Sequence, residues 1–158
     1  MIDNEIYIFE RASKKDVQEI LNWKFNGIYS FYNNDKTPEK SEWISNLDRD
    51  ESAFVIRNNR GELVANCCFT YDNDEKTYLF GIQLKPELTG KGLGRSIVEQ
   101  SLKFGKSMFQ FESIDLLVAD FNKRAIKLYT NLEFTIIEEF DANSNGENVH
   151  FLVMRKYL

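Results

Sequence analysis

The stretch PELTGKGLGR, residues 86–95, decides how the rest of this chain is interpreted. Its three glycines, Gly90, Gly92 and Gly94, stand at alternate positions between a strand-like apolar run and a helix-like amphipathic run. Glycine lets backbone N–H groups converge on an anion, and the first turn of a helix favours negative charge. The stretch therefore predicts a phosphate-binding loop between a strand and a helix.

Two other kinds of phosphate-binding loop fit the spacing poorly. A Walker loop ends in Gly-Lys-Ser/Thr, whereas this loop runs from Gly90 to Arg95 without the hydroxyl that holds magnesium. A dinucleotide loop has the spacing Gly-x-Gly-x-x-Gly early in a parallel fold, but three strands with antiparallel turn signals precede this loop. A nucleotide-binding protein is therefore the weaker alternative, and a tight turn without a ligand is another.

The segments before the loop predict the order β-α-α-β-β-β. An alternating strand begins at Ile6, and Ser13 caps a helix whose apolar residues share one face. After an aromatic loop, a second helix runs from Thr37 to about Leu47. Residues 52–86 then form an antiparallel meander of three strands with polar turns.

The segments after the loop predict the order α-β-α-β-β. A helix from Gly94 leads into IDLLVAD, residues 114–120, a continuous apolar strand typical of burial on both faces. Asn122 caps a shorter helix. FTIIEEF and HFLVMRKYL then form a hairpin with its turn at residues 143–148.

The bulk composition limits the classes of protein that fit. A length of 158 residues with 42% hydrophobic side chains suits one folded domain, residues 1–158. The net charge of −5 argues against nucleic acid as a partner. With a single histidine, His150, and the adjacent Cys67 and Cys68, we expect reduced thiols and no metal site. We expect a cytoplasmic protein without membrane attachment, because no leader-like or spanning apolar run is present.

Together these features resemble the GNAT superfamily of N-acetyltransferases across nearly the whole chain. The loop is similar to the superfamily's pyrophosphate loop, Arg/Gln-x-x-Gly-x-Gly/Ala, with Thr89 at the first position. VADFNKRAIKLYTNLEF, residues 118–134, resembles its second motif. The resemblance implies an α/β fold, with a mixed, mostly antiparallel sheet of six to seven strands that is flanked by about four helices and splayed between strands 4 and 5.

Two positions depart from the superfamily's pattern. Thr89 replaces the usual Arg or Gln, and we expect this change to weaken or alter the contact with pyrophosphate. Glu133 stands where a glycine usually precedes Phe134, and we expect it to change only a turn.

The resemblance implies an acetyl-CoA-dependent N-acetyltransferase. Such an enzyme moves the acetyl group to a primary amine of a small molecule, protein or peptide by direct attack in a ternary complex. The superfamily's coenzyme A site corresponds here to Ile82, Gln83, Leu84, Thr89, Gly90, Lys91, Gly92, Leu93, Gly94, Arg95 and Asn122. The strand would bind through its backbone, so its side chains would matter little. A non-catalytic acyl-CoA-binding regulatory domain of the same fold is the alternative.

Tyr129 matches the superfamily's general acid, which protonates the departing sulfur of coenzyme A. Tyr129 also shares an apolar helical stripe with Leu128, so core packing is the competing interpretation. No carboxylate is placed by a motif as the general base. Water relays to Asp72, Asp74 or Glu75 are guesses.

The aromatic loop, residues 22–37, is the candidate acceptor site. Trp23, Tyr29, Phe31 and Tyr32 would wall an apolar pocket near the first two helices, and core packing explains these side chains equally well. The acidic net charge would suit a cationic acceptor such as a polyamine. We expect a monomer or a homodimer.

Overall fold

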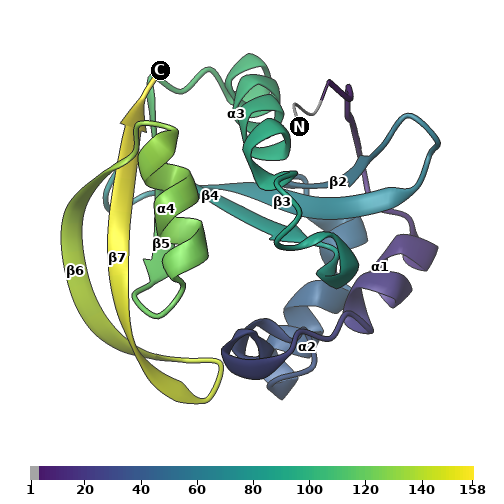
Figure 1. Cartoon of the computed structure of the whole chain (residues 1–158), viewed down its shortest axis with the longest axis horizontal. Coiled ribbons are helices and arrows are strands. Elements are labelled where there is room, and N and C mark those ends of the chain that lie inside the picture. Colours follow the sequence, from purple (N-terminus) through teal and green to yellow (C-terminus); the bar gives the residue numbers. More distant parts are fainter. Residues whose placement is uncertain (1–3) are drawn as a thin grey trace.

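A computed structural model describes residues 4–158, which contain one seven-stranded sheet (Figure 1). The strand order is β1-β2-β3-β4-β5-β7-β6, and every pair of neighbours is antiparallel except β4 and β5. The strands are β1 (Ile8–Glu10), β2 (Ala53–Arg57), β3 (Leu63–Asp72), β4 (Thr77–Leu84), β5 (Ser113–Ala119), β6 (Thr135–Ser144) and β7 (Glu147–Tyr157). This arrangement confirms the expected α/β fold.

Four α-helices accompany the sheet in the described part of the chain. They are α1 (Lys14–Leu21), α2 (Pro38–Ser45), α3 (Gly94–Phe109) and α4 (Lys123–Asn131), with short 3-10 helices η1 (Gly27–Tyr32), η2 (Leu47–Arg49) and η3 (Pro86–Leu88). The predicted caps are present: the side-chain oxygens of Ser13, Thr37 and Asn122 each accept a backbone N–H three residues on. The second helix ends earlier than expected, because the N–H of Asn46 bonds back to Trp43 and tightens the last turn.

The helices divide the apolar core into two layers. On one face of the sheet, Ile97, Val98 and Leu102 of α3 pack with Phe69 of β3, and α4 packs against the same layer. On the other face, α1 and α2 enclose a second cluster that includes Trp23. Figure 1 shows α3 and the α1–α2 pair on opposite sides of β2, β3 and β4. Cys67 and Cys68 are both free, and they contribute to opposite layers, as the strand alternation predicted.

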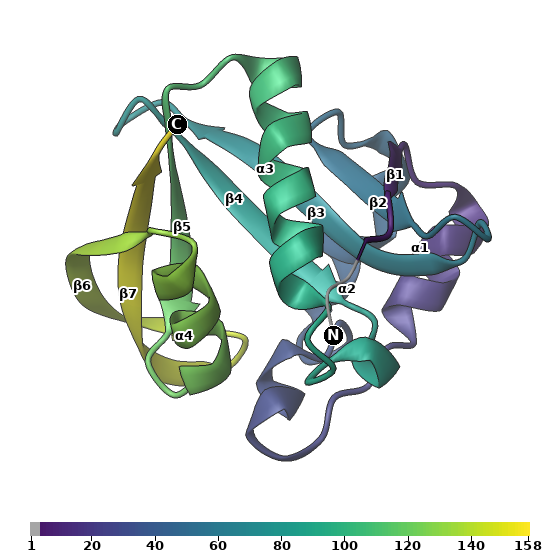
Figure 2. The ribbon, with the colours of Figure 1, turned by 45° about the horizontal axis from the view of Figure 1, so that its top comes forward.

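The expected splay between β4 and β5 is the feature that opens the site. Only Tyr78 opposite Ile114 and Leu79 opposite Asp115 are in register. The strands diverge beyond these pairs (Figure 2), so β4 has no neighbour on that side along residues 81–84. Backbone groups there are free to bind a ligand.

A third cluster joins the N-terminal part of the chain to the C-terminal half of the sheet. Phe31 of η1 packs with Ala119 of β5 and Val149 of β7, and its carbonyl accepts a 3.0 Å hydrogen bond from Asn145 Nδ2. Asn145 and Gly146 have φ of 49° and 79°, so a two-residue turn links strands longer than predicted. η1 is thereby fixed across the splay.

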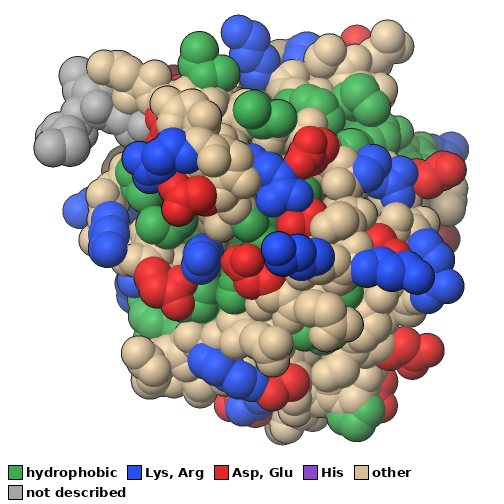
Figure 3. Space-filling view, turned by 90° about the vertical axis from the view of Figure 1, so that its right-hand side faces the viewer, with side chains coloured by type: hydrophobic (Ala, Val, Ile, Leu, Met, Phe, Trp, Pro, Cys, Tyr) green, Lys and Arg blue, Asp and Glu red, His purple; other side chains and the backbone are tan. Residues whose placement is uncertain are grey.

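The surface carries charges of both signs. On the face in Figure 3, basic and acidic side chains are interspersed without a single-sign patch. Within residues 4–158, no helix is long and apolar enough to traverse a bilayer.

Candidate active site

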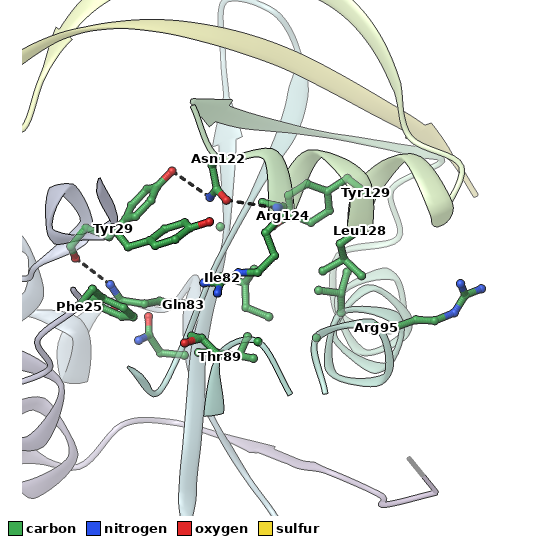
Figure 4. A pocket seen from close by; sticks show the side chains of 18 of the residues that line it. Phe25, Tyr29, Ile82, Gln83, Thr89, Arg95, Asn122, Arg124, Leu128 and Tyr129 are labelled. Carbon is green, nitrogen blue, oxygen red and sulfur yellow. Dashed lines mark hydrogen bonds between the residues drawn. The ribbon is translucent and has the colours of Figure 1, made fainter. Parts of the chain in front are cut away.

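A cavity of about 520 Å³ lies where β4 and β5 diverge. Its walls come from β4, the glycine loop with the start of α3, α4, η1 and α2 (Figure 4). The two segments that the sequence singled out, residues 86–95 and 118–134, both face it from opposite sides. A ligand in this cavity would contact every element that we expected to be functional.

The glycine loop forms an anion cradle at the start of α3. Gly90 and Gly92 have φ of 72° and 78°, which glycine adopts without strain. A Cβ added at Gly92 would meet nothing within 4 Å, so the space in front of the loop is open. Leu93 caps α3 without a side-chain hydrogen bond, which leaves the first N–H groups of this helix for a ligand. The loop therefore fits a pyrophosphate group.

Not every expected loop residue faces the cavity. Thr89, Gly90, Gly92, Gly94 and Arg95 line it, whereas Lys91 is exposed outside it and Leu93 packs against the apolar core. The Arg95 guanidinium pairs with Glu99 at 2.9 Å and points away from the other labelled side chains in Figure 4.

Arg124 is a cation that the sequence analysis missed. Its Nη1 lies 3.4 Å from the position that a Cβ on Gly90 would take, and its guanidinium carbon lies 4.3 Å above the ring of Tyr29. Thr89 carries no charge, and its hydroxyl donates to the carbonyl of Pro86 at 2.8 Å. Arg124 lies two residues after Asn122 within the second motif, and that position was the available signal.

The three predicted β4 residues, Ile82, Gln83 and Leu84, all line the cavity. Contrary to our expectation, the side chain of Gln83 has a structural role. Gln83 Oε1 accepts a hydrogen bond from Asn34 Nδ2 at 2.8 Å, and Gln83 Nε2 donates to the carbonyl of Tyr32 at 3.0 Å. Gln83 thereby ties β4 to η1 at the floor of the cavity.

Tyr129 and Asn122 meet at the α4 side of the cavity. The Tyr129 ring contacts Phe134 edge to face, with centroids 5.6 Å apart, so Tyr129 takes part in both core packing and the cavity wall. Burial raises the pKa of the Tyr129 phenol well above its usual range, and the nearby Tyr32 raises it further. The phenol is therefore protonated at physiological pH. Asn122 Nδ2 donates to the Tyr32 hydroxyl at 3.1 Å, which fixes a second phenol beside it.

The aromatic loop divides between the cavity and the core. Tyr29 and Tyr32 line the cavity, as expected for acceptor-site residues. Trp23 and Phe31 do not: each is 4% exposed, Trp23 beneath α1 and Phe31 in the cluster with β5 and β7. Both side chains therefore lie in the core, because each packs against an element remote in sequence.

Lys40 is a second cation that the sequence analysis missed. Its ammonium donates to the Tyr32 carbonyl at 3.0 Å in the cavity wall, and burial lowers the pKa of Lys40 to about 8. A lysine in the first turn of a helix opposes the dipole, which was the one sequence signal. By contrast, Asp72 ends β3, and Asp74 and Glu75 belong to the β3–β4 turn. None of the three lines the cavity, so the structure does not support a water relay to them.

Comparison with known proteins gives a consistent picture. The sequence model of the acetyltransferase (GNAT) family matches residues 14–134. The chain is 31% identical over 118 residues to the spermidine N(1)-acetyltransferase of Vibrio cholerae, a match covering 70% of this chain and 68% of that protein. A chimeric V. cholerae spermidine N-acetyltransferase has the same fold, with a TM-score of 0.75, 20% identity, and coverage of 96% and 95%. The dodecameric V. cholerae enzyme also has this fold, with a TM-score of 0.69, 19% identity, and coverage of 96% and 93%.

Proposed function

The chain belongs to the acetyltransferase (GNAT) family, and from this membership we propose how its cavity performs acetyl-CoA-dependent N-acetylation of a primary amine. The observation that carries the proposal is that one cavity joins the anion cradle at Gly90 and Gly92 to the buried phenol of Tyr129. Both substrates can then meet in one place, and holding two reactants together removes much of the entropic cost of reaction.

Coenzyme A would be held at three places. The N–H groups at the start of α3 would bind the pyrophosphate, with Arg124 supplying the charge that Thr89 lacks. The unpaired backbone of β4 at residues 82–84 would bind the pantetheine arm, and Asn122 would contact it from α4. When bound, acetyl-CoA supplies the activated acetyl group.

Tyr129 would act as the general acid. As the acceptor nitrogen forms its bond to the acetyl carbon and the carbon–sulfur bond breaks, the phenol would give its proton to the sulfur. The nitrogen would then lose one N–H proton to water to give the neutral amide, and water would return a proton to the phenolate. The ammonium proton of the acceptor leaves to solvent before attack. The raised pKa of Tyr129 ensures that the phenol carries its proton before the reaction.

The test is the substitution Tyr129→Phe. We expect kcat to fall by about a hundredfold, in the usual range for losing an acid, while the Kd for acetyl-CoA changes by less than about threefold. Thiol release with a panel of amines measures kcat, and calorimetric titration measures Kd. Tyr71→Phe on the exposed part of β3 is the control and should leave both values unchanged. Unaltered kcat in the Tyr129 variant would remove the acid role.

A non-catalytic acyl-CoA-binding domain predicts a different result. It would bind acetyl-CoA in the calorimeter and release no thiol with any amine. For the assembly, we propose a monomer or a homodimer, and light scattering would distinguish either from a dodecamer like that of the structural relative.

A further inference from the structure

We infer that the acceptor is a monoamine with an uncharged, apolar body and not a polyamine. The inference rests on the proposed function, because it concerns the acceptor half of the same cavity. It departs from the acceptor in the relatives' names, spermidine, and from the cationic acceptors that the acidic net charge would suit.

The charged side chains that line the cavity have one sign. Among residues 4–158 they are Arg95, Arg124 and Lys127 on the side of α3 and α4, and Lys40 of α2 beside the aromatic wall. Aliphatic amines have pKa values near 10.4, so a polyamine at neutral pH would bring a second ammonium group close to Lys40. Like charges repel more strongly when partly desolvated, and a polyamine would find no carboxylate among these lining residues to offset that cost.

The aromatic wall of the cavity leaves little ring surface for a second ammonium group. Phe25, Tyr29, Tyr32 and Trp43 present large apolar surfaces to the cavity. Aromatic rings can bind ammonium groups through their faces, but the Arg124 guanidinium already covers the face of Tyr29 at 4.3 Å. The wall therefore favours an apolar body over a second cation.

Two buried amide side chains at the floor of the cavity each have a polar atom without a hydrogen-bond partner. Asn34 and Asn66 are 0% and 8% exposed, and both line the cavity. Asn34 Oδ1 and Asn66 Nδ2 have no hydrogen-bond partner, whereas most buried polar atoms have one. Gln83 links them, since it bonds to Asn34 and lies opposite Asn66 in the β3–β4 register. One neutral acceptor and one neutral donor suit an uncharged amine better than a dication.

The cations that line the cavity also affect the protonation of a bound amine. Nearby positive charge lowers the pKa of a bound ammonium and so increases the fraction of neutral, nucleophilic amine. A monoamine that binds as its free base therefore needs no carboxylate base in the cavity.

The experiment compares hexylamine with hexamethylenediamine, which share a carbon chain and differ by one amine. With the full chain and saturating acetyl-CoA, we expect kcat/KM for hexylamine to exceed that for the diamine by about tenfold or more, with spermidine also poor. Added sodium chloride should narrow the difference, because salt screens the repulsion. An equal or higher kcat/KM for the diamine or spermidine would overturn the inference.

Calorimetric binding of both amines to the coenzyme A complex is a readout independent of turnover. We expect the monoamine to bind about tenfold more tightly, and tighter binding of the diamine would contradict the inference. Absence of thiol release with both amines and with the wider panel of amines would instead refute the proposed function. Lys40→Gln should reduce the preference for hexylamine over hexamethylenediamine several-fold in both the turnover and the binding assay. Lys36→Gln is the matched control and should preserve it, because Lys36 pairs with Glu147 at 3.2 Å outside the cavity.

Discussion

Arg124 illustrates how one side chain can supply what a motif lacks. It leaves the first turn of α4, stacks on Tyr29 and approaches the loop at Gly90, where superfamily members carry an Arg or Gln in the position of Thr89. A charged hydrogen bond to a phosphate oxygen is about twice as strong as a neutral one. We therefore propose that Arg124, which tertiary contacts bring to the loop, offsets the departure at Thr89.

We predict that Arg124→Gln raises the Kd for acetyl-CoA by about tenfold, because the pyrophosphate would lose a cation next to Gly90. Calorimetric titration measures the change. Lys123→Gln, on the same turn but outside the cavity, is the control and should leave Kd within about twofold. If the two variants bound acetyl-CoA equally well, Arg124 would have no part in the cofactor site.

Glu133 carries local strain that a single substitution can relieve. It follows the C-terminal end of α4 with φ of 71°, where most proteins place glycine. A side chain in this left-handed region costs roughly 1–2 kcal/mol. The ion pair between Glu133 and Lys156, at 3.6 Å, offsets little of that cost because it is exposed to solvent.

We therefore predict that Glu133→Gly raises the free energy of unfolding by about 1 kcal/mol, measured by urea denaturation. Glu42→Gly in the interior of α2 should have the opposite sign, because glycine destabilises a regular helix by about 1 kcal/mol. A loss of stability in the Glu133 variant would show that its carboxylate matters more than its backbone.

At the scale of elements, Glu139 and Asp141 of β6 form an acidic clamp around His150 of β7, the single histidine of the chain. His150 of β7 lies opposite Asp141 of β6, and its ring nitrogens lie 2.8 Å from Asp141 and 2.8 Å from Glu139. Hydrogen bonds to Glu139 and then to Asp141 raise the pKa of His150 above its ordinary value. The histidine is part of a cross-strand pair well inside β7.

The sign of the pH dependence follows from that raised pKa. The protonated imidazole stabilises the hairpin fully below its unfolded-state pKa of about 6.5, and this contribution is lost as pH rises through the folded-state pKa. NMR titration should show the single His150 resonance titrating above 6.5. Glu139→Gln should lower the midpoint, and an unchanged midpoint would mean that the clamp does not form in solution.

The aromatic loop shows why an element's composition alone did not reveal its role. Tyr29 and Tyr32 line the cavity while Phe31, between them in sequence, lies in the core. A 3-10 turn sends neighbouring side chains in different directions, and the β5–β7 surface selects the one that is buried. No local pattern encodes that choice.

On the scale of the whole molecule, the splay makes β4 and β5 two edges that a ligand can join. Only two register pairs connect the halves of the sheet directly, while η1 connects them through Phe31. Filling the cavity with coenzyme A should therefore couple the halves more tightly.

We predict that acetyl-CoA at about a hundred times its Kd stabilises the fold by about 2.7 kcal/mol. Hydrogen exchange should slow at residues 81–84 and 90–94, where backbone N–H groups would gain partners. The β3–β4 turn at residues 73–76, which contributes no residue to the cavity lining, serves as the internal reference and should exchange at an unchanged rate. Protection elsewhere without protection at residues 81–84 would place the cofactor outside the splay.

The sequence by itself determined the elements, their order and the family. Caps at Ser13, Thr37 and Asn122 are local signals, because each acts within a few residues of backbone. These caps are present, so the predicted starts of their helices are confirmed. The roles of the glycine loop and of Tyr129 stay predictions. Net charge is also a property of the sequence, yet it suggested a polycationic acceptor for a cavity whose charged walls are cationic.

Only the tertiary structure decided which side chains surround that cavity. Trp23 and Phe31 are buried, while Arg124, Lys40 and Asn34 face the site, and each outcome depends on contacts between segments far apart in the chain. Packing across the splay sets these contacts, since a side chain is buried or exposed according to the surface that approaches it. The physical reason is that burial and local charge are properties of neighbours in space, and the sequence lists neighbours only along the chain.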